Sequence, residues 1–321
     1  MQTGRPSRTA LSSARARAVH QVADTPRVFA DPLAARIIDG VDGVQDAPLP
    51  AGAPGMPAEV RLFMALRHRV AEDALAAAPH TGQVVILGAG LDTFAYRNRD
   101  PALRVFEVDL PATQEWKRRR LAEAGIEVPE TVVFCPVDFA EQSVGDGLAA
   151  AGFDRHAPAF FLLLGVAPYL TRDALLATAR FVAEMPAPAE LVFDYNQPAA
   201  AMPPHRRPAL AAQAEAMARM GEPWRSFFTP PEIAAELADA GFDGVADVGW
   251  RECLARYGLD PSLPDLFGGR IVHARASGTG SGRPGTTAAT AGTATGTAPG
   301  PAAGTAPGPA AGRAARRERS Q

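Results

Sequence analysis

The sequence predicts an α/β fold in which helices flank a mostly parallel sheet of seven strands. Strand-like and helix-like segments alternate along most of the chain, which is typical of parallel sheets with right-handed crossovers. The apolar run Val84–Leu87 leads directly into Gly88-Ala89-Gly90, and a buried strand that ends in glycines lets a nucleotide-type ligand approach the backbone. The chain has 321 residues, 47% of them hydrophobic, which is enough for a large core. The expected architecture is therefore Rossmann-like.

Seven segments have the apolar, β-branched character of strands: residues 83–87, 104–109, 131–137, 159–164, 190–195, 244–250 and 270–275. The helices expected between them cover 111–124, 141–151, 171–184 and 231–240. Their start and stop signals include Pro111 in a first turn, Thr171 as an N-cap with Asp173 after it, and Gly125 and Gly241 after helix ends. Only a short helix and a loop separate the last two strands, which predicts a hairpin-like pair at one edge of the sheet.

Three segments lie outside this alternation. Residues 1–78 contain helix-like stretches at 8–22, 32–39 and 57–77 and are expected to form an N-terminal helical cap. Within the core, 79–275, residues 198–229 interrupt the sheet with a Pro-rich opening and an amphipathic run at 208–220. We expect this insertion to be a lid over the carboxyl ends of the strands, where such sheets bind ligands. Residues 276–321 are almost wholly Gly, Ala, Thr, Pro and Ser, which predicts a disordered tail.

Composition and charge exclude several classes of protein. The tail carries a net charge of +4 and the body −7, and an acidic body is a poor match for nucleic acid. No apolar run reaches the roughly 18 residues of a membrane span. The two cysteines, Cys135 and Cys253, cannot form a disulfide framework and fit a reducing cytoplasm. The N-terminal arginines resemble a transit peptide in composition alone, and we expect them on a folded helix. Zinc-ligand spacing, a G-x-S-x-G elbow and a P-loop lysine are all absent, so no metal is expected.

The glycine turn after the first strand narrows the choice of cofactor. A dinucleotide fingerprint has a third glycine three residues after Gly90, where this chain has Thr93. The acidic Asp92 follows the turn almost at once. This combination is less typical of NAD than of S-adenosylmethionine (SAM). Asp109 ends the second strand, and a carboxylate there can accept the ribose hydroxyls of either cofactor.

Several segments follow one another in a compatible order and spacing between residues 8 and 275. They are RTALSSARARAVHQVADTPRVFADPLAARII, ALRHRVAEDAL, VVILGAGLDTFAYR, RVFEVDLPATQEWKRRRL, CPVDF and LLLGVAPYLT. Each is weak alone, but together they resemble the leucine carboxyl methyltransferase family, in its bacterial branch of class I SAM-dependent O-methyltransferases. In that branch an arginine usually stands at the position of Phe94. The branch includes enzymes of secondary metabolism, so the resemblance implies a small-molecule substrate.

The resemblance implies how the methionine end of SAM would be held. It would lie against Gly88, Ala89 and Gly90, whose backbone N–H groups would face the SAM carboxylate at the start of a helix. Arg67 would pair with the same carboxylate, because a planar guanidinium suits a bidentate contact. Asp92 would orient the loop or cap the helix that follows.

The remaining cofactor contacts are also implied by the resemblance. Asp109 would hold the ribose, with Glu107 as a second candidate on the same face of the strand. Asp138 and Phe139 would contact the adenine. The family usually places a glutamate that contacts SAM at the position of Leu164, so this chain lacks one expected acid.

No residue is securely placed as a catalytic base. Tyr169 and Tyr195 follow the fourth and fifth strands and could orient a substrate oxygen, although simple packing would also explain them. His205 lies in the expected lid, where a polar surface position is the alternative. A carboxylate acceptor, with a pKa near about 4, needs no base at pH 7, whereas a phenol near about 10 would profit from one. The lack of a placed base favours a carboxylate over a hydroxyl as the methyl acceptor. The sequence leaves the oligomeric state open.

Two other functions remain as alternatives. An NAD(P)-dependent oxidoreductase would use the same strand and Asp109, but the missing third glycine argues against it. A non-catalytic SAM-binding or interaction protein would explain both Leu164 and the lack of a base.

Overall fold

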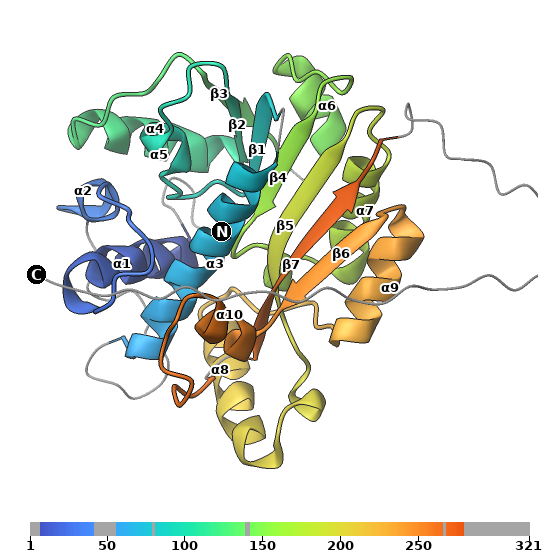
Figure 1. The fold of residues 1–321 in the computed structure, drawn as a ribbon. Coiled ribbons are helices and arrows are strands. Elements are labelled where there is room, and N and C mark those ends of the chain that lie inside the picture. Colours follow the sequence, from blue (N-terminus) through green and yellow to red (C-terminus); the bar gives the residue numbers. More distant parts are fainter. Residues whose placement is uncertain (1–6, 42–55, 79–80, 139–141, 266–267, 279–321) are drawn as a thin grey trace, which may run out of the picture. The chain divides into compact units, whose positions relative to one another are not determined.

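The seven predicted strands form one sheet in the computed structural model, which describes residues 7–41, 56–78, 81–138, 142–265 and 268–278. The strands are β1 (Gln83–Leu87), β2 (Arg104–Asp109), β3 (Val132–Pro136), β4 (Ala159–Leu163), β5 (Ala189–Asn196), β6 (Gly244–Val248) and β7 (Gly269–Ala276). Their order across the sheet is β3-β2-β1-β4-β5-β7-β6 (Figure 1). The five strands β1 to β5 pair in parallel, and β7 pairs antiparallel with both β5 and β6. The predicted strands are confirmed, as is the hairpin-like pair at one edge.

The helices largely follow the predicted positions. They are α1 (Arg8–Ala23), α2 (Ala34–Ile38), α3 (Ala58–Ala77), α4 (Phe94–Arg97), α5 (Pro111–Glu123), α6 (Val144–Ala150), α7 (Arg172–Ala183), α8 (Arg207–Arg219), α9 (Pro230–Ala240) and α10 (Trp250–Arg256), with short 3-10 turns at Ala167–Tyr169, Ala199–Ala201 and Pro204–Arg206. The one-turn helix α4 was not predicted. Trp250, expected to end a strand, begins α10 instead.

The predicted helix boundaries have the expected chemistry. The Thr171 hydroxyl accepts a hydrogen bond from the Ala174 N–H at 3.2 Å and so caps α7. Gly241 ends α9 in the left-handed region, at φ 110°. Pro111 occupies the first turn of α5, where its missing N–H costs nothing.

The two faces of the sheet build two separate cores, because side chains alternate along each strand. Val85 and Leu87 point toward α6, α7 and α9, whereas Val84 and Ile86 point toward α3 and α10. Figure 1 shows α3 and the α7–α9 pair on opposite sides of the strands. A third cluster joins α1, α2 and α5 through Leu11, Ile37 and Leu121. The N-terminal helices are therefore packed onto the core at its carboxyl edge.

The described part of the chain ends shortly after β7. Strand β7 ends at Ala276, close to the predicted end of the core, while the repetitive segment from 279 onward lies outside the described residues. Across the described helices, none combines the length and apolarity that a membrane crossing requires.

Candidate functional site

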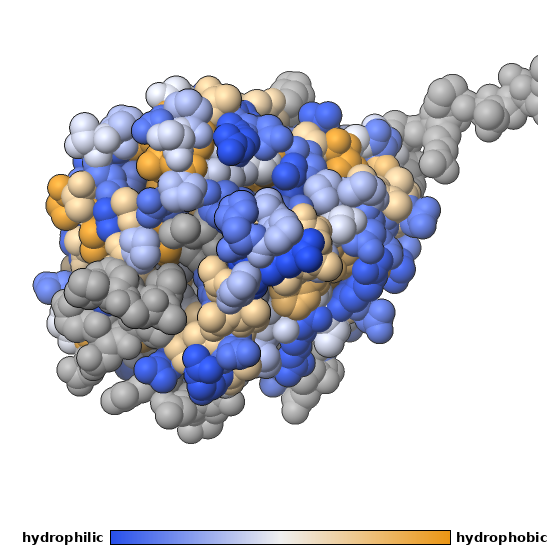
Figure 2. Space-filling model, turned by 90° about the horizontal axis from the view of Figure 1, so that it is seen from below, coloured by the Kyte–Doolittle hydropathy of each residue, from blue (hydrophilic) through white to orange (hydrophobic). Residues whose placement is uncertain are grey.

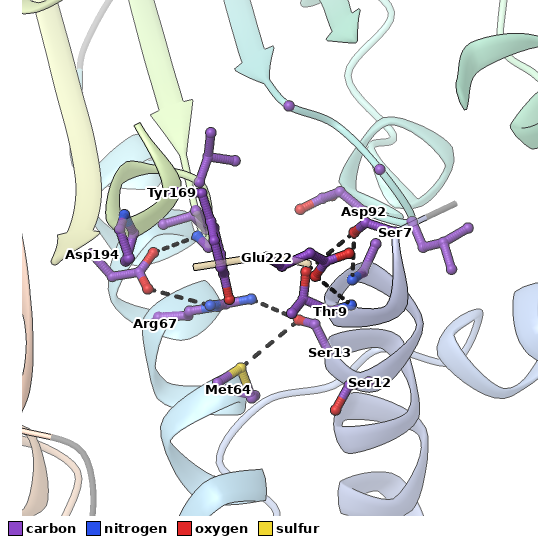
Figure 3. A pocket seen from close by; sticks show the side chains of 18 of the residues that line it. Ser7, Thr9, Ser12, Ser13, Met64, Arg67, Asp92, Tyr169, Asp194 and Glu222 are labelled. Atoms are coloured by element: carbon purple, nitrogen blue, oxygen red, sulfur yellow. Dashed lines mark hydrogen bonds and ion pairs between the residues drawn. The ribbon is translucent and has the colours of Figure 1, made fainter. Parts of the chain in front are cut away.

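A cavity of about 480 Å³ lies at the carboxyl ends of β1, β4 and β5. Strand order reverses between β1 and β4, and open α/β sheets bind ligands at that position. The floor comes from the turn Gly88–Asp92, from Asp109 at the end of β2 and from Leu164–Val166 after β4. Helices α1 and α3 and part of the segment from Gln213 to Arg225 form the walls (Figure 3). Figure 2, viewed from below Figure 1, shows hydrophilic residues interspersed with apolar ones over this side of the molecule.

The glycine turn is fixed by its own backbone bonds. The N–H groups of Gly88 and Ala89 both donate to the Val108 carbonyl, at 2.8 and 3.1 Å, and the Gly90 N–H donates to Asp109 Oδ2 at 2.7 Å. The prediction that these N–H groups face a ligand anion is wrong, because the protein itself uses all three. Gly88 has φ 66°, and a Cβ there would lie 2.6 Å from Val166 Cγ2. The glycine is required by the close approach of β4's end.

Asp109 stands where the sequence predicts, at the end of β2 and in the cavity wall. Its carboxylate accepts the Gly90 N–H and, at 2.7 Å, the Leu110 N–H. Burial raises its pKa above the ordinary value, against the opposing effect of these two donors. Glu107, its alternative, is fully buried outside the cavity, where it binds Lys117 Nζ and the Tyr96 hydroxyl at 2.8 Å each.

Arg67 projects from α3 into the cavity wall and forms a buried ion pair with Asp194 of β5. One terminal nitrogen donates to Asp194 Oδ2 at 3.2 Å and the other to Ser13 Oγ at 2.6 Å. Asp194 Oδ1 accepts the Gly165 N–H at 2.5 Å (Figure 3). The guanidinium lies so close to Gly165 that a Cβ there would be 2.8 Å from it. Arg67 Nε is buried and has no hydrogen-bond partner among the described residues.

Asp92 belongs to a second buried network beside the turn. Its Oδ1 accepts the Phe94 N–H at 2.7 Å, at the start of α4, which agrees with the expected role in ordering the loop. Its Oδ2 lies 3.4 Å from His68 Nδ1. His68 Nε2 lies 3.4 Å from an Arg17 nitrogen, and Arg17 also donates to the Leu91 carbonyl at 2.7 Å. Burial lowers the pKa of His68 well below its usual range, so the imidazole is neutral.

The structure does not confirm the predicted contacts to adenine. Asp138 follows β3 and is absent from the cavity lining, and Phe139 lies outside the described residues. Their adenine contacts remain predictions. Leu164 does line the cavity, beside Gly165.

The three weak catalytic candidates occupy very different places. Tyr169 lines the cavity together with Trp224 and Thr9, and burial raises the pKa of its hydroxyl. Tyr195 points into the core on the opposite face of the sheet and donates its hydroxyl to Asp247, so the expectation that it sits at the site's edge is wrong. His205 is exposed and does not line the cavity.

The sequence did not predict several of the residues that line the cavity. Asp194 and Asn196 alternate along the last residues of β5, and polar residues in so apolar a strand were the available signal. Ser13 and Glu222 gave no such signal, because their roles depend on contacts between distant segments. The Glu222 carboxylate accepts the N–H groups of Arg8 and Thr9, at 3.0 and 3.1 Å, and joins the predicted lid to the start of α1.

Known proteins resemble this chain in sequence. Residues 10–183 match the family model of leucine carboxyl methyltransferase. The chain belongs to this family. A relative from Bacillus subtilis, YktD, is 31% identical over 75% of this chain and 88% of its own length, and one from Frankia alni is 33% identical over 80% and 88%. Both are named provisionally as S-adenosyl-L-methionine-dependent methyltransferases.

A solved structure shares the fold at lower sequence similarity. The protein, from Thermobifida fusca and provisionally named a methyltransferase, has 19% identity and a TM-score of 0.50, over 86% of this chain and 97% of its own. The predicted family and the Rossmann-like architecture are therefore both confirmed.

Proposed function

We propose that this protein transfers the methyl group of SAM to a carboxylate oxygen of a small molecule. The chain belongs to a family of methyltransferases. Its relatives are named as methyltransferases that depend on SAM. The chemical class of the acceptor is our own inference. The observation that supports it is the absence of any uncommitted base among the described residues that line the cavity.

The residues present fit SAM. The buried Nε of Arg67 offers an unused charged donor for the carboxylate of the methionine end. Asp109, at the end of β2, retains acceptor capacity for ribose hydroxyls beyond its two backbone donors. The sulfonium of SAM supplies an electrophilic methyl group, and the protein's part is to align an oxygen with it, which can lower the barrier by roughly 7–11 kcal/mol.

Every acidic side chain that lines the cavity is already hydrogen-bonded inside the protein: Asp92 to Phe94, Asp109 to Gly90 and Leu110, Asp194 to Gly165 and Arg67, and Glu222 to Arg8 and Thr9. His68 is neutral and lies between Asp92 and Arg17. Burial raises the pKa of Tyr169 and keeps its phenol protonated. An acceptor that is ionised already, such as a carboxylate, requires none of these groups as a base.

The lining also suits a small, largely apolar acceptor. Beyond the cofactor residues the lining includes thioether, aliphatic and aromatic side chains together with neutral hydroxyls and amides: Met56, Val60, Phe63, Met64, Met217, Trp224, Ser12, Asn196 and Gln213. Such a wall binds an apolar body and leaves a few hydrogen bonds to orient one polar end.

The test is methyl transfer from methyl-labelled SAM to a panel of apolar monocarboxylic acids and phenols of similar size. We expect label in the acids, and we expect mild alkali to release it as methanol, because esters hydrolyse and methyl ethers do not. Alkali-stable label confined to the phenols would refute the carboxylate proposal.

Titration with NADH, NADPH and SAM separates the two alternatives. We expect binding of SAM alone. Binding of a nicotinamide cofactor without SAM would support an oxidoreductase, and SAM binding with no transfer to any acid or phenol would support a non-catalytic protein.

A further inference from the structure

The ion pair of Arg67 and Asp194 has both an unused donor and unused acceptor capacity. Each side chain is only 7% exposed. Arg67 donates two hydrogen bonds although a guanidinium has about five N–H groups, and its Nε has no partner among the described residues. Asp194 accepts two hydrogen bonds although a carboxylate has about four lone-pair positions. Both residues line the same cavity (Figure 3). A buried donor left unpaired is costly, so a ligand group that accepts a hydrogen bond from Arg67 would stabilise this wall.

A neutral pair with free N–H donors and free acceptor positions is complementary to a zwitterion. An α-amino acid group presents a carboxylate to the donor and an ammonium to the acceptor, and it adds no net charge. A lone carboxylate at the same place would leave one buried negative charge without compensation, which is strongly unfavourable.

Asp194 is also close to the position where the family's acid is missing. Leu164 precedes Gly165, and the Gly165 N–H is the group that donates to Asp194 Oδ1 at 2.5 Å. The carboxylate of β5 therefore reaches the backbone at the end of β4, next to the residue that usually carries a glutamate.

We propose that Asp194 replaces the acid missing at Leu164 and binds the α-ammonium of SAM, beside the α-carboxylate that the family resemblance already assigns to the Arg67 guanidinium. This inference rests on the proposed function, since it assigns contacts to its cofactor. Asp194 thereby becomes a cofactor-binding residue as well as the partner that orients Arg67. The acid that contacts the cofactor would then come from β5, and not from position 164 directly after β4.

The experiment measures affinity by calorimetry for three ligands. They are S-adenosylhomocysteine, its analogue without the α-amino group, and 5′-methylthioadenosine, which lacks the whole amino-acid end. In Asp194→Asn we expect affinity for S-adenosylhomocysteine to fall roughly 10- to 100-fold, as for loss of a charged hydrogen bond. Affinity for the other two ligands should change less than about 3-fold, which a general structural defect would not produce.

Leu164→Glu supplies the reciprocal test. In the Asp194→Asn background it should restore about 10-fold or more of the lost affinity, because it returns an acid to the neighbouring position. In the wild-type background it should gain less than about 3-fold, since the ammonium already has its partner. Asp173→Asn, an exposed acid in the first turn of α7, is the matched control and should bind all ligands normally.

The outcomes are separable. Equal losses for all three ligands, no loss at all, or a large gain from Leu164→Glu alone would each overturn the inference and leave the proposed function standing. If Asp194→Asn does not fold, the wild type must still bind S-adenosylhomocysteine about 10-fold or more tighter than the desamino analogue, and equal affinity would overturn it. Failure of the wild type to bind any of the three would instead refute the proposed function.

Discussion

At the scale of single residues, the cavity is built from charges that are buried and already paired. Arg67, Asp194, Arg17 and Asp31 are each almost fully buried, and removing one member of such a pair leaves the other charge uncompensated. These pairs therefore fix where the side chains point more than they add net stability. The turn after β1 is defined in the same way, by close contacts that allow no side chain at Gly88.

Gly88→Ala should lower the free energy of unfolding by about 2–4 kcal/mol. The new Cβ would require left-handed backbone at φ 66° and would overlap Val166. Urea denaturation measures the change. Gly82→Ala is the control, because a Cβ there meets nothing within 4 Å, and a loss of the same size in this variant would contradict the steric explanation.

Asp109→Asn should weaken binding of S-adenosylhomocysteine roughly 10- to 100-fold, because a charged acceptor for ribose hydroxyls is lost. The variant should also lose the wild type's preference for this ligand over its 2′-deoxy analogue. Calorimetry with both ligands measures the two effects. If the variant retained the full preference, Asp109 would not be the ribose ligand.

At the scale of elements, segments far apart in the sequence enclose the cavity together. Helix α1 contributes Ser13 and Arg17, which contact Arg67 and the turn after β1. Glu222, between α8 and α9, accepts two N–H groups at the start of α1, where a carboxylate also suits the helix dipole. The Glu222 carboxylate thus links this segment to the start of α1, in addition to the bonds that Arg225 and Ser226 make to the turn after β4.

Glu222→Ala should increase amide hydrogen exchange in the first turn of α1 and in residues 220–225, with little effect on the sheet. The loss of two charge-assisted caps corresponds to about 1–2 kcal/mol of local stability. Exchange detected by mass spectrometry measures this. Glu215→Ala, an exposed acid on α8 paired only with Arg219, is the matched control. Equal exchange in the two variants would show that Glu222 does not stabilise the contact between this segment and the start of α1.

At the scale of the whole molecule, the N-terminal helices and the sheet share one buried polar network. His68 lies at its centre, next to Arg17, Arg67 and Arg97, and burial together with these cations lowers its pKa. The imidazole must therefore stay neutral for the cap to remain packed against the core, which makes stability depend on pH.

The wild type should lose stability as the pH falls below about 6.5, relative to His68→Gln. Below that pH the unfolded state binds a proton at His68 that the folded state excludes, so the free energy of unfolding decreases with acidity. Between pH 7.5 and 5.5 the difference should be about 1.4 kcal/mol. Denaturation curves at several pH values measure it. Parallel pH profiles for the two proteins would show that His68 does not carry this dependence.

The local patterns of the sequence determined the order and type of the strands and the glycine turn. Apolar periodicity, helix caps and the acid at the end of β2 are properties of neighbouring residues, so Asp109 and Gly88 could be placed without the structure. The motif order likewise identified the family. The one-turn helix α4 was not predicted, because four residues are too few to show a helical periodicity of apolar side chains.

Only the tertiary structure decided which of these residues share the site. It placed Tyr195 in the opposite core, used the N–H groups of the glycine turn internally, and left His205 outside the cavity. It also joined Asp194 to Arg67 across 127 positions and Glu222 to the start of α1 across more than 200. Such pairings depend on how strands and helices pack, and the sequence near each residue carries no physical signal of its distant partner.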